Sequence, residues 1–283
     1  MSKFFKKKIF RLLFSIIVLL IAGFYYAFQN NFFDKTDDFV IEYDNQKYNV
    51  IVEKPQEHKD KYPLIIFNHG GGYETLEPFD LRGTAKRLSK EGFLVWIPER
   101  SLWLPEVVLG RLSEAKGVSK TILDIALQHS DVDKNNINVM GFCLGSWAIL
   151  EENIYSENIK SMSLIAFGAP FDHTVIYDRL FKFIEEIDYE KISTKVLIMV
   201  SQGDTRLNIE AGEALRSNMV DAKKKVSVVQ YEEGDHLSMT GVKRYLEDVI
   251  KFVKGEKVNS AGYIQLDKDL LEKRDSLIKK GYW

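Results

Sequence analysis

The sequence predicts an α/β domain in which helices cover both faces of a mostly parallel sheet. Short apolar runs alternate along the chain with segments whose apolar residues recur at helical spacing. Helical segments placed between strands are typical of the crossover connections that join parallel strands. With 283 residues, 45% of them hydrophobic, the chain can bury one large core.

Turn residues bound the expected elements. The strand at 63–67 ends at a run of three glycines, and Gly92 closes the helix at 81–91. In chain order, strands are expected at 39–43, 48–52, 63–67, 93–97, 137–140, 162–167, 196–200 and 226–230, the first two as a hairpin. Helices are expected at 81–91, 118–129, directly after Cys143, and at 175–187, 209–219 and 241–253. A charged helix at 267–280 is expected as an appendage without chemistry.

The first 35 residues differ from the rest. Lysines and Arg11 precede the apolar stretch Leu12–Phe28, which is about the minimum length that crosses a bilayer. Basic residues before this stretch and aspartates after it predict a transmembrane segment with its N-terminus in the cytoplasm. A cleaved signal peptide is the competing interpretation, but aromatic residues occupy the place of a small-residue cleavage site, which favours an uncleaved signal anchor. Residues 36–283 then form the main domain, outside the cytoplasm.

Composition excludes several classes of protein. The net charge of −2 and the absence of a basic stripe interleaved with aromatics beyond the first residues argue against a nucleic-acid partner. One cysteine cannot form an intramolecular disulfide, and the histidines are too scattered to suggest a zinc site. We therefore expect neither a metal nor another cofactor. The histidines are His58, His69, His129, His173 and His236.

Cys143 is a candidate nucleophile. It stands in the sequence Gly-Phe-Cys-Leu-Gly-Ser at 141–146, directly after the apolar run 137–140. A strand that reverses into a helix within one or two residues holds the apex side chain above the sheet, and flanking glycines clear space around it. The N-terminus of the following helix then stabilises a thiolate. A lone cysteine is more often a small buried hydrophobe, but this glycine frame favours the nucleophile.

A nucleophilic thiol needs a base, and the base needs a carboxylate to orient it. Asp204 follows the strand expected at 196–200, and His236 follows the next strand and precedes a long helix. Loops at the carboxyl ends of parallel strands converge at one edge of a sheet, so these side chains are expected to meet Cys143 there. Asp235 and Glu233 are rival candidates for the acid, although a carboxylate adjacent to its histidine engages the ring poorly.

The glycine run after the strand at 63–67 predicts donors for an oxyanion, because backbone N–H groups of glycines approach a ligand without a Cβ. We expect the Leu144 N–H to act together with an N–H of Gly71 or Gly72. A tight turn and a phosphate-binding loop are alternatives, but the lysine of a P-loop is absent. His69 is expected to be a structural hydrogen-bonding group rather than a catalyst.

Other residues near the same edge have weaker assignments. Glu99 and Arg100 are expected to form an ion pair that supports a loop, with substrate recognition as the alternative. Aromatic side chains are candidates for the substrate pocket, although such residues are more often part of a core. These candidates are Tyr73, Trp103, Trp147 and Phe171.

These motifs, in this order, resemble those of the alpha/beta-hydrolase superfamily, and the cysteine elbow resembles that of the dienelactone hydrolase family. The similarity spans about Ile51–Val253 and implies an alpha/beta-hydrolase fold with a triad of Cys143, Asp204 and His236. The glycine loop is closer to the loops of esterases. No arginine directly follows His236 to hold a substrate carboxylate, so dienelactone itself is not the expected substrate.

Together these features predict a membrane-anchored hydrolase of small-molecule carboxylic esters, lactones or thioesters that works through an acyl-cysteine. An acyltransferase that uses the same acyl-enzyme is one alternative. An inactive, hydrolase-like binding module at the membrane is another.

Overall fold

The computed structural model describes residues 37–70, 81–100, 108–170, 174–201, 204, 207–208, 210–231 and 243–258. The elements below belong to one unit of the chain, Asp38–Trp283. The predicted membrane segment at 12–28 and the predicted helix at 267–280 lie outside the described residues. Within the described ranges, no helix combines the length and the apolar character needed to cross a membrane.

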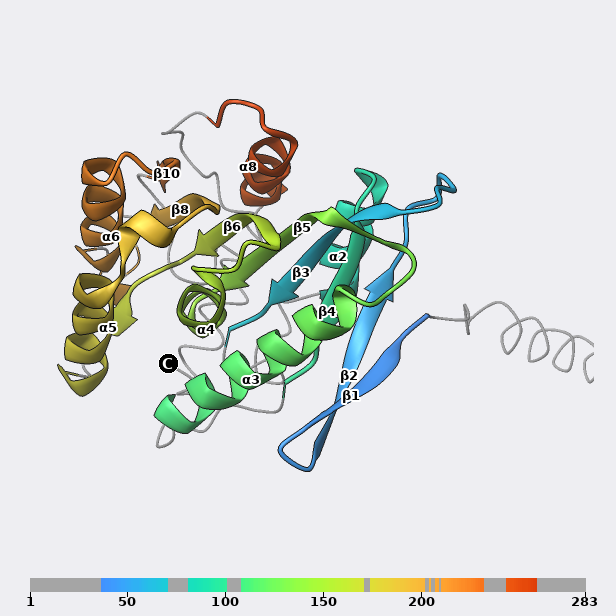
Figure 1. Cartoon of the computed structure of the whole chain (residues 1–283), viewed down its shortest axis with the longest axis horizontal. Helices are drawn as coiled ribbons and strands as arrows, with labels where there is room; N and C mark the ends of the chain where they lie inside the picture. The colour runs from blue at the N-terminus through green and yellow to red at the C-terminus, as the bar shows by residue number, and fades with distance from the viewer. Residues whose placement is uncertain are drawn as a thin grey trace, which may run out of the picture. The chain divides into compact units, whose positions relative to one another are not determined.

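Eight strands form the sheet at the centre of the described part (Figure 1). β2 pairs antiparallel with both of its neighbours, whereas the strands from β4 onward in the sheet pair in parallel. The carboxyl ends of these parallel strands therefore meet at one edge, and the predicted mostly parallel sheet is confirmed. The order across the sheet is β1 (Phe39–Tyr43), β2 (Gln46–Glu53), β4 (Leu94–Pro98), β3 (Tyr62–Asn68), β5 (Val132–Phe142), β6 (Ile159–Ile165), β8 (Lys195–Ser201) and β10 (Val226–Tyr231).

Helices cover both faces of this sheet, as predicted (Figure 1). One face carries α3 (Val108–Ala126), α4 (Leu144–Asn153), α5 (Thr174–Glu186) and α6 (Glu210–Asp221). The other carries α2 (Leu81–Lys90) and α8 (Lys243–Lys254). Side chains of a strand alternate between faces. In β3, Leu64 and Ile66 accordingly join the core on the first face, while Ile65 and Phe67 join the core on the second.

Local turn chemistry explains the opening hairpin. Asp44 and Asn45 connect β1 to β2 with φ angles of 51° and 59°. Asparagine and aspartate tolerate this left-handed region better than most residues, and two such residues in succession make the tight turn that suits the twist of a hairpin. The predicted hairpin is therefore present for a local reason.

One helix and one small sheet differ from the sequence prediction. α3 begins at Val108 rather than at 118, because glycines in its first half weaken the helical signal. Gly117 is needed there: a Cβ at this position would lie 1.9 Å from Cζ of Tyr43, which packs against the helix. A two-stranded antiparallel sheet of β7 (Ala169–Pro170) and β9 (Leu207–Asn208) has no signal in the sequence.

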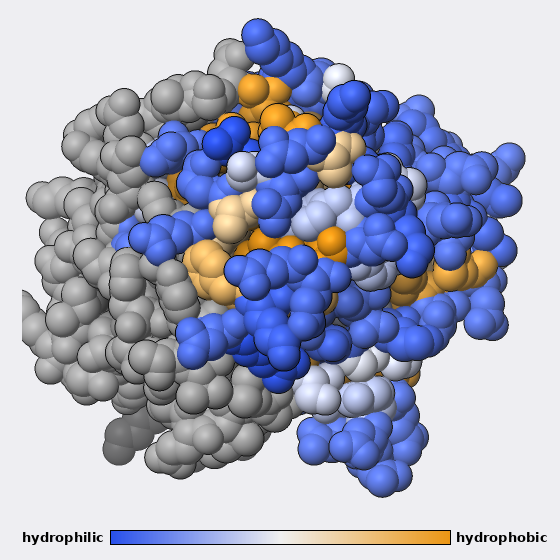
Figure 2. All heavy atoms as spheres, turned by 60° about the vertical axis from the view of Figure 1, so that its left-hand side comes forward, coloured by the Kyte–Doolittle hydropathy of each residue, from blue (hydrophilic) through white to orange (hydrophobic). Residues whose placement is uncertain are grey.

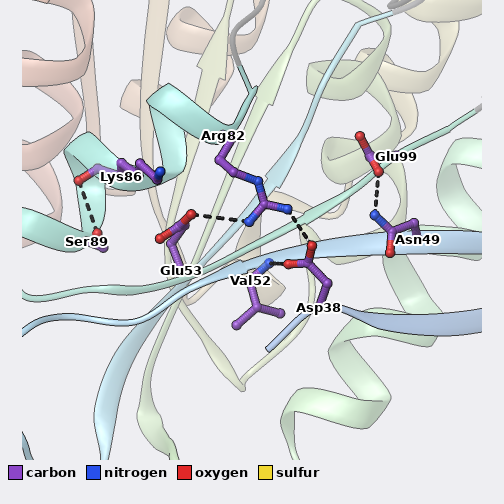
Figure 3. Close-up of polar contacts among 8 residues, drawn as sticks. All are labelled: Asp38, Asn49, Val52, Glu53, Arg82, Lys86, Ser89 and Glu99. Atoms are coloured by element: carbon purple, nitrogen blue, oxygen red, sulfur yellow. Dashed lines mark hydrogen bonds and ion pairs between the residues drawn. The ribbon is translucent and has the colours of Figure 1, made fainter. Parts of the chain in front are cut away.

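A polar cluster fixes the start of β1 to the sheet (Figure 3). The Arg82 guanidinium, at the beginning of α2, donates to the Asp38 carboxylate and, at 3.2 Å, to Glu53. Asp38 also accepts the backbone N–H of Val52 at 2.8 Å. The point at which the chain enters the domain is therefore held by an ion-pair network and by the sheet itself.

Figure 2 shows that the described surface on the face in view is largely hydrophilic, with apolar side chains in small separate patches. Large hydrophobic side chains that are exposed in the described part include Val40, Tyr155 and Val220. They come from β1, the segment after α4, and α6, so they form no single group along the chain.

Candidate active site

Cys143 lies at the apex of the turn from β5 into α4, and its backbone is strained. Its φ is 52° and its ψ is −119°. A residue with a side chain adopts such a conformation at a cost of about 1–3 kcal/mol, and such residues cluster at functional sites. The side chain is half-buried. The predicted placement of a thiol on a sharp turn from strand to helix is therefore present.

The glycines on either side of Cys143 are required by close backbone packing. A Cβ at Gly141 would lie 2.5 Å from the carbonyl carbon of Gly145, and a Cβ at Gly145 would lie 2.0 Å from the carbonyl oxygen of Asn68. Real Cβ atoms do not approach backbone atoms so closely. The glycine frame lets α4 start directly against the ends of β3 and β5.

The end of β6 holds the turn in place. The Cys143 N–H donates to the carbonyl of Ile165 at 2.9 Å, and the Ile165 N–H donates to the hydroxyl of Ser146 at 2.9 Å. The next residue, Ala166, is itself in the left-handed region with a φ of 49°. Cys143 and Ala166, both with positive φ, therefore lie next to the hydrogen bond that joins the end of β5 to the end of β6.

Leu144 is the first residue of α4. The carbonyl of Cys143 accepts the N–H groups of Ser146 at 2.9 Å and Trp147 at 3.3 Å, so the helix starts at once behind the thiol. N–H groups in the first turn of a helix have no acceptor within the helix. Leu144 is therefore the first residue of the helix behind the thiol, and its role as an oxyanion donor stays a prediction.

Asp204 lies just past the carboxyl end of β8 and is buried, with 5% of its surface exposed. Its backbone N–H donates to the carbonyl of Ser201 at 3.2 Å. Because β5, β6 and β8 are adjacent parallel strands, the structure brings Asp204 to the same edge of the sheet as Cys143.

The other predicted site residues lie outside the described residues, and their roles stay predictions. They are His236 as the base, Gly71 and Gly72 as oxyanion donors, and Tyr73, Trp103 and Phe171 as pocket residues.

His69 and Gly70, at the end of β3, are described. His69 Nδ1 lies 2.7 Å from the carbonyl oxygen of Gly70, and Nε2 accepts the backbone N–H of Arg100 at 3.1 Å. Burial, together with the nearby charge of Arg100, lowers the pKa of His69 from 6.5 to about 3. The ring is therefore neutral near pH 7 and both of its nitrogens are used, as the expected structural role requires.

Glu99 and Arg100 do not form the expected ion pair with each other. The Glu99 carboxylate accepts a hydrogen bond from the side-chain amide of Asn49 (Figure 3). The Arg100 guanidinium turns to the other side and donates to the carbonyl of His69. Consecutive residues of extended chain point in opposite directions, which separates the two charges.

Trp147, a predicted pocket residue, packs in the core with 3% of its surface exposed. Its ring N–H donates to Glu151 at 2.6 Å, and the Arg179 guanidinium lies 5.7 Å from the ring centroid. Glu151 also pairs with Lys116 of α3 at 2.8 Å. Trp147 thus helps to join α3, α4 and α5, while its role in a pocket stays a prediction.

Two buried polar residues at this edge were not assigned a role from the sequence. Ser146 binds the ends of β5 and β6, and Asn68 is fully buried beside α4 with no hydrogen-bond partner for its side-chain amide within the described residues. Buried polar groups without partners are rare, and functional sites are one place where they occur. The only sequence signal for either residue is its position next to a glycine motif.

No group of three or more metal-ligating side chains comes together among the described residues. The described groups at this edge are a half-buried thiol at a helix N-terminus, a buried carboxylate and a glycine backbone beside the thiol. Such a set suits attack on a carbonyl carbon.

Comparisons with known proteins relate the chain to hydrolases. The dienelactone hydrolase family model matches residues 105–245, which include Cys143 and Asp204. No curated protein sequence gives a significant match.

Solved structures share the fold at low identity. A protein of Klebsiella pneumoniae assigned as a dienelactone hydrolase has a TM-score of 0.55 at 16% identity, with 78% of this chain and 95% of that chain covered. The 2,6-dihydroxy-pseudo-oxynicotine hydrolase has a TM-score of 0.57 at 13% identity, with 81% and 71% covered. The acylaminoacyl peptidase of Pyrococcus horikoshii has a TM-score of 0.58 at 14% identity, with 82% of this chain but only 43% of the peptidase covered. These likenesses show an alpha/beta-hydrolase-like fold, and the family match over residues 105–245 identifies the chain as a dienelactone hydrolase-like hydrolase.

Proposed function

We propose that the chain hydrolyses carboxylic esters, lactones or thioesters of small molecules through an acyl intermediate on Cys143. The observation that carries the proposal is the backbone of Cys143, with φ 52° and ψ −119°, at the turn from β5 into α4. Backbone strain at this turn costs free energy of folding, so its presence favours a functional role for the residue that carries it. The strained residue is Cys143, and its half-buried thiol is the reactive group at this position.

Acylation follows from the side chains assigned to the site. His236 takes the proton of the Cys143 thiol, the resulting thiolate attacks the carbonyl carbon, a C–S bond forms, and the carbonyl π electrons move to the oxygen. The Leu144 N–H and an N–H of Gly71 or Gly72 stabilise this oxyanion. When the intermediate collapses, the C–O or C–S bond to the leaving group breaks, and His236 gives the departing group a proton.

Deacylation uses the same groups in reverse. His236 takes a proton from water as the water oxygen attacks the acyl carbon, and a second oxyanion forms. Its collapse breaks the C–S bond and releases the carboxylic acid and the Cys143 thiolate. Asp204 holds the imidazole of His236 in the orientation that both steps need.

Sulfur chemistry restricts the substrates. A thiolate leaves readily, so the first intermediate returns to substrate unless the other leaving group is comparably good. Enol lactones, aryl esters and thioesters meet this condition and amides do not. We therefore include ester-type substrates in the proposal and exclude peptides.

The proposal also includes a membrane anchor. The stretch Leu12–Phe28, with its basic N-terminal flank, supports a single-pass segment with the N-terminus in the cytoplasm and the hydrolase domain on the other side. Cell fractionation and protease accessibility of the full chain test it. Recovery of the full chain in the soluble fraction would contradict the anchor. Failure of a protease added outside the cytoplasm to cleave the hydrolase domain would contradict the proposed orientation.

The experiment for the enzymatic part is turnover of p-nitrophenyl acetate by the full chain in detergent. We expect Cys143→Ala and His236→Ala to lower kcat by at least about 10³-fold. Ser130→Ala, which changes an exposed residue whose hydroxyl donates to its neighbour Asp131, serves as the control. Equal rates in all four proteins would end the proposal.

Two further measurements separate the alternatives. Product analysis with and without an added alcohol distinguishes hydrolysis from acyl transfer, because an acyltransferase forms a new ester. Alkylation by iodoacetamide near neutral pH distinguishes a reactive thiolate from an inert buried thiol.

A further inference from the structure

A buried pair of side chains holds the backbone that passes beside the nucleophile. His69 and Arg100 are 2% and 7% exposed, and they follow the adjacent parallel strands β3 and β4. Two hydrogen bonds join them: the backbone N–H of Arg100 donates to the His69 ring, and the Arg100 guanidinium donates to the His69 carbonyl. Arg100, just past β4, thus holds both the side chain and the main chain of His69, just past β3.

The same histidine holds the next residue. Its ring donates from Nδ1 to the carbonyl of Gly70 at 2.7 Å, and its Nε2 remains the acceptor for Arg100. A neutral ring protonated on Nδ1 satisfies both of these contacts, and the backbone of Pro98 is a further polar neighbour of the ring. The two contacts form a continuous chain from the Arg100 backbone through the imidazole to the Gly70 carbonyl.

Gly70 lies against the nucleophile. A Cβ at Gly70 would be 3.3 Å from Cβ of Cys143 and 3.0 Å from Cδ1 of Phe142. There is little room for the Gly70 backbone to move toward Cys143, and among the described residues the hydrogen bond from the His69 ring restrains its carbonyl, with His69 itself held by Arg100. A shift of the Gly70 backbone changes its distance from Cys143.

We propose that His69 and Arg100 are positioning residues, which set the glycine loop that begins at Gly70 at the distance from Cys143 that oxyanion stabilisation requires. The inference rests on the function proposed above and assigns a role in it to residues outside the triad. Oxyanion donors act at about 2.7–3.1 Å, and a displacement of 1 Å lowers a rate by about 10²-fold. Arginine suits this role because its rigid, planar fork holds an acceptor in one geometry, whereas a lysine ammonium does not.

The test is a set of variants of the full chain. Arg100→Met removes the guanidinium, and we expect kcat for p-nitrophenyl acetate to fall by about 10²-fold while KM changes by no more than about twofold. Arg100→Lys keeps the charge without the fork and should lose about tenfold in kcat. The alkylation rate of Cys143 by iodoacetamide should stay within about twofold of wild type, because alkylation forms no oxyanion.

His69 offers a matched pair of variants. The amide of His69→Asn can replace Nδ1 as the donor to Gly70, whereas the amide of His69→Gln reaches the position of Nε2 and leaves the Gly70 carbonyl free. We therefore expect His69→Asn to keep kcat within about tenfold of wild type and His69→Gln to lose about 10²-fold. Equal loss in the two variants would overturn the assignment of His69.

Arg82→Met is the control for lost stability. Like Arg100, Arg82 donates hydrogen bonds to groups on other segments of the chain. Its acceptors are the carboxylates of Asp38 and Glu53. It should lower Tm without lowering kcat. Loss of kcat in Arg82→Met equal to that in Arg100→Met, or unchanged kcat in a folded Arg100→Met, would overturn the inference. Failure of the proposed function itself is a different result: wild type would then turn over substrate no faster than Cys143→Ala.

Discussion

The hydroxyl of Ser146 is bound to both backbone polar groups of Ile165. It accepts the Ile165 N–H at 2.9 Å and lies 2.8 Å from the Ile165 carbonyl, with the Gly141 carbonyl at 2.6 Å as a second acceptor for its proton. Through this one side chain, the first turn of α4 is attached to the ends of β5 and β6. Cys143 lies inside the bend that these contacts close.

Ser146→Ala should therefore destabilise the protein. The substitution leaves the buried Ile165 N–H without its acceptor, and a buried unsatisfied group costs about 1–3 kcal/mol. Urea denaturation measures the loss in the free energy of unfolding. The exposed Ser130→Ala is the control and should change it by less than about 0.5 kcal/mol. Equal stability of the two variants would contradict the role given to Ser146.

Gly145→Ala should be the most damaging small change near the elbow. Its Cβ would lie 2.0 Å from the carbonyl oxygen of Asn68 and 2.7 Å from that of His69, and these backbone atoms cannot give way as a flexible side chain can. We expect a loss of at least about 3 kcal/mol in the free energy of unfolding. Gly212→Ala in α6 is the matched control, because its Cβ would lie 3.3 Å from the nearest side chain and 3.8 Å from the nearest backbone atom among its close neighbours. That variant should change stability by no more than about 1 kcal/mol, since alanine favours the helix. Similar values for the two would be incompatible with the packing described.

The stability of the protein should fall as the pH falls from 6.5 toward 3, in part because of His69. Burial and the charge of Arg100 lower the pKa of this histidine to about 3 in the folded state, against 6.5 when it is unfolded. Between these values the unfolded state binds one more proton at this site. The stabilisation is complete above pH 6.5 and decreases by up to about 1.4 kcal/mol per pH unit below it. Denaturation curves at several pH values give the free energy of unfolding as a function of pH. This free energy should fall less steeply below pH 6.5 for His69→Asn than for wild type. The same slope in both proteins would disprove the assignment.

The hydrogen bond between Tyr231 and Asp248 should stabilise the end of β10. The Tyr231 hydroxyl donates to Asp248 of α8 at 2.8 Å, and both residues are buried. Between β10 and α8 the chain carries His236. Tyr231→Phe removes the donor from a buried carboxylate and should cost about 1–3 kcal/mol. Tyr155→Phe, which changes a 43% exposed residue, should cost less. A double-mutant cycle with Asp248→Asn measures the coupling between the two side chains, and a coupling of zero would show that the contact is not stabilising.

Sequence patterns predicted most elements because the information they need is local. The strands of the sheet are short apolar runs that end at turn residues, and the hairpin depends on Asp44 and Asn45 alone. The elbow is similar, since Gly141 and Gly145 mark it within five residues of sequence. The start of α3 could not be predicted this way, because Gly117 weakens the helical pattern and is explained only by Tyr43, which packs against it from another element.

The pairing of Arg100 with His69 depended on contacts that no local pattern contains. The sequence favoured Glu99 as the partner of Arg100 because the two are adjacent, whereas the fold brings residues 31 positions apart together at the ends of parallel strands. The ring N–H of Trp147 likewise donates to Glu151 on its own helix. The cations that pair with Glu151 are Lys116 of α3 and Arg179 of α5.

By itself, the sequence determined the α/β class, the strand-to-helix turn that carries Cys143 and the chain order of the candidate triad. These follow from the spacing of hydrophobic residues, from the glycines that flank Cys143, and from the chemistry of the candidate side chains. Only the tertiary structure decided the order of strands in the sheet, the burial of Asp204 and the contacts that hold Gly70 against the thiol. The physical reason is that burial and hydrogen bonding between distant segments depend on the packed arrangement of the whole domain, which residues close in sequence do not specify.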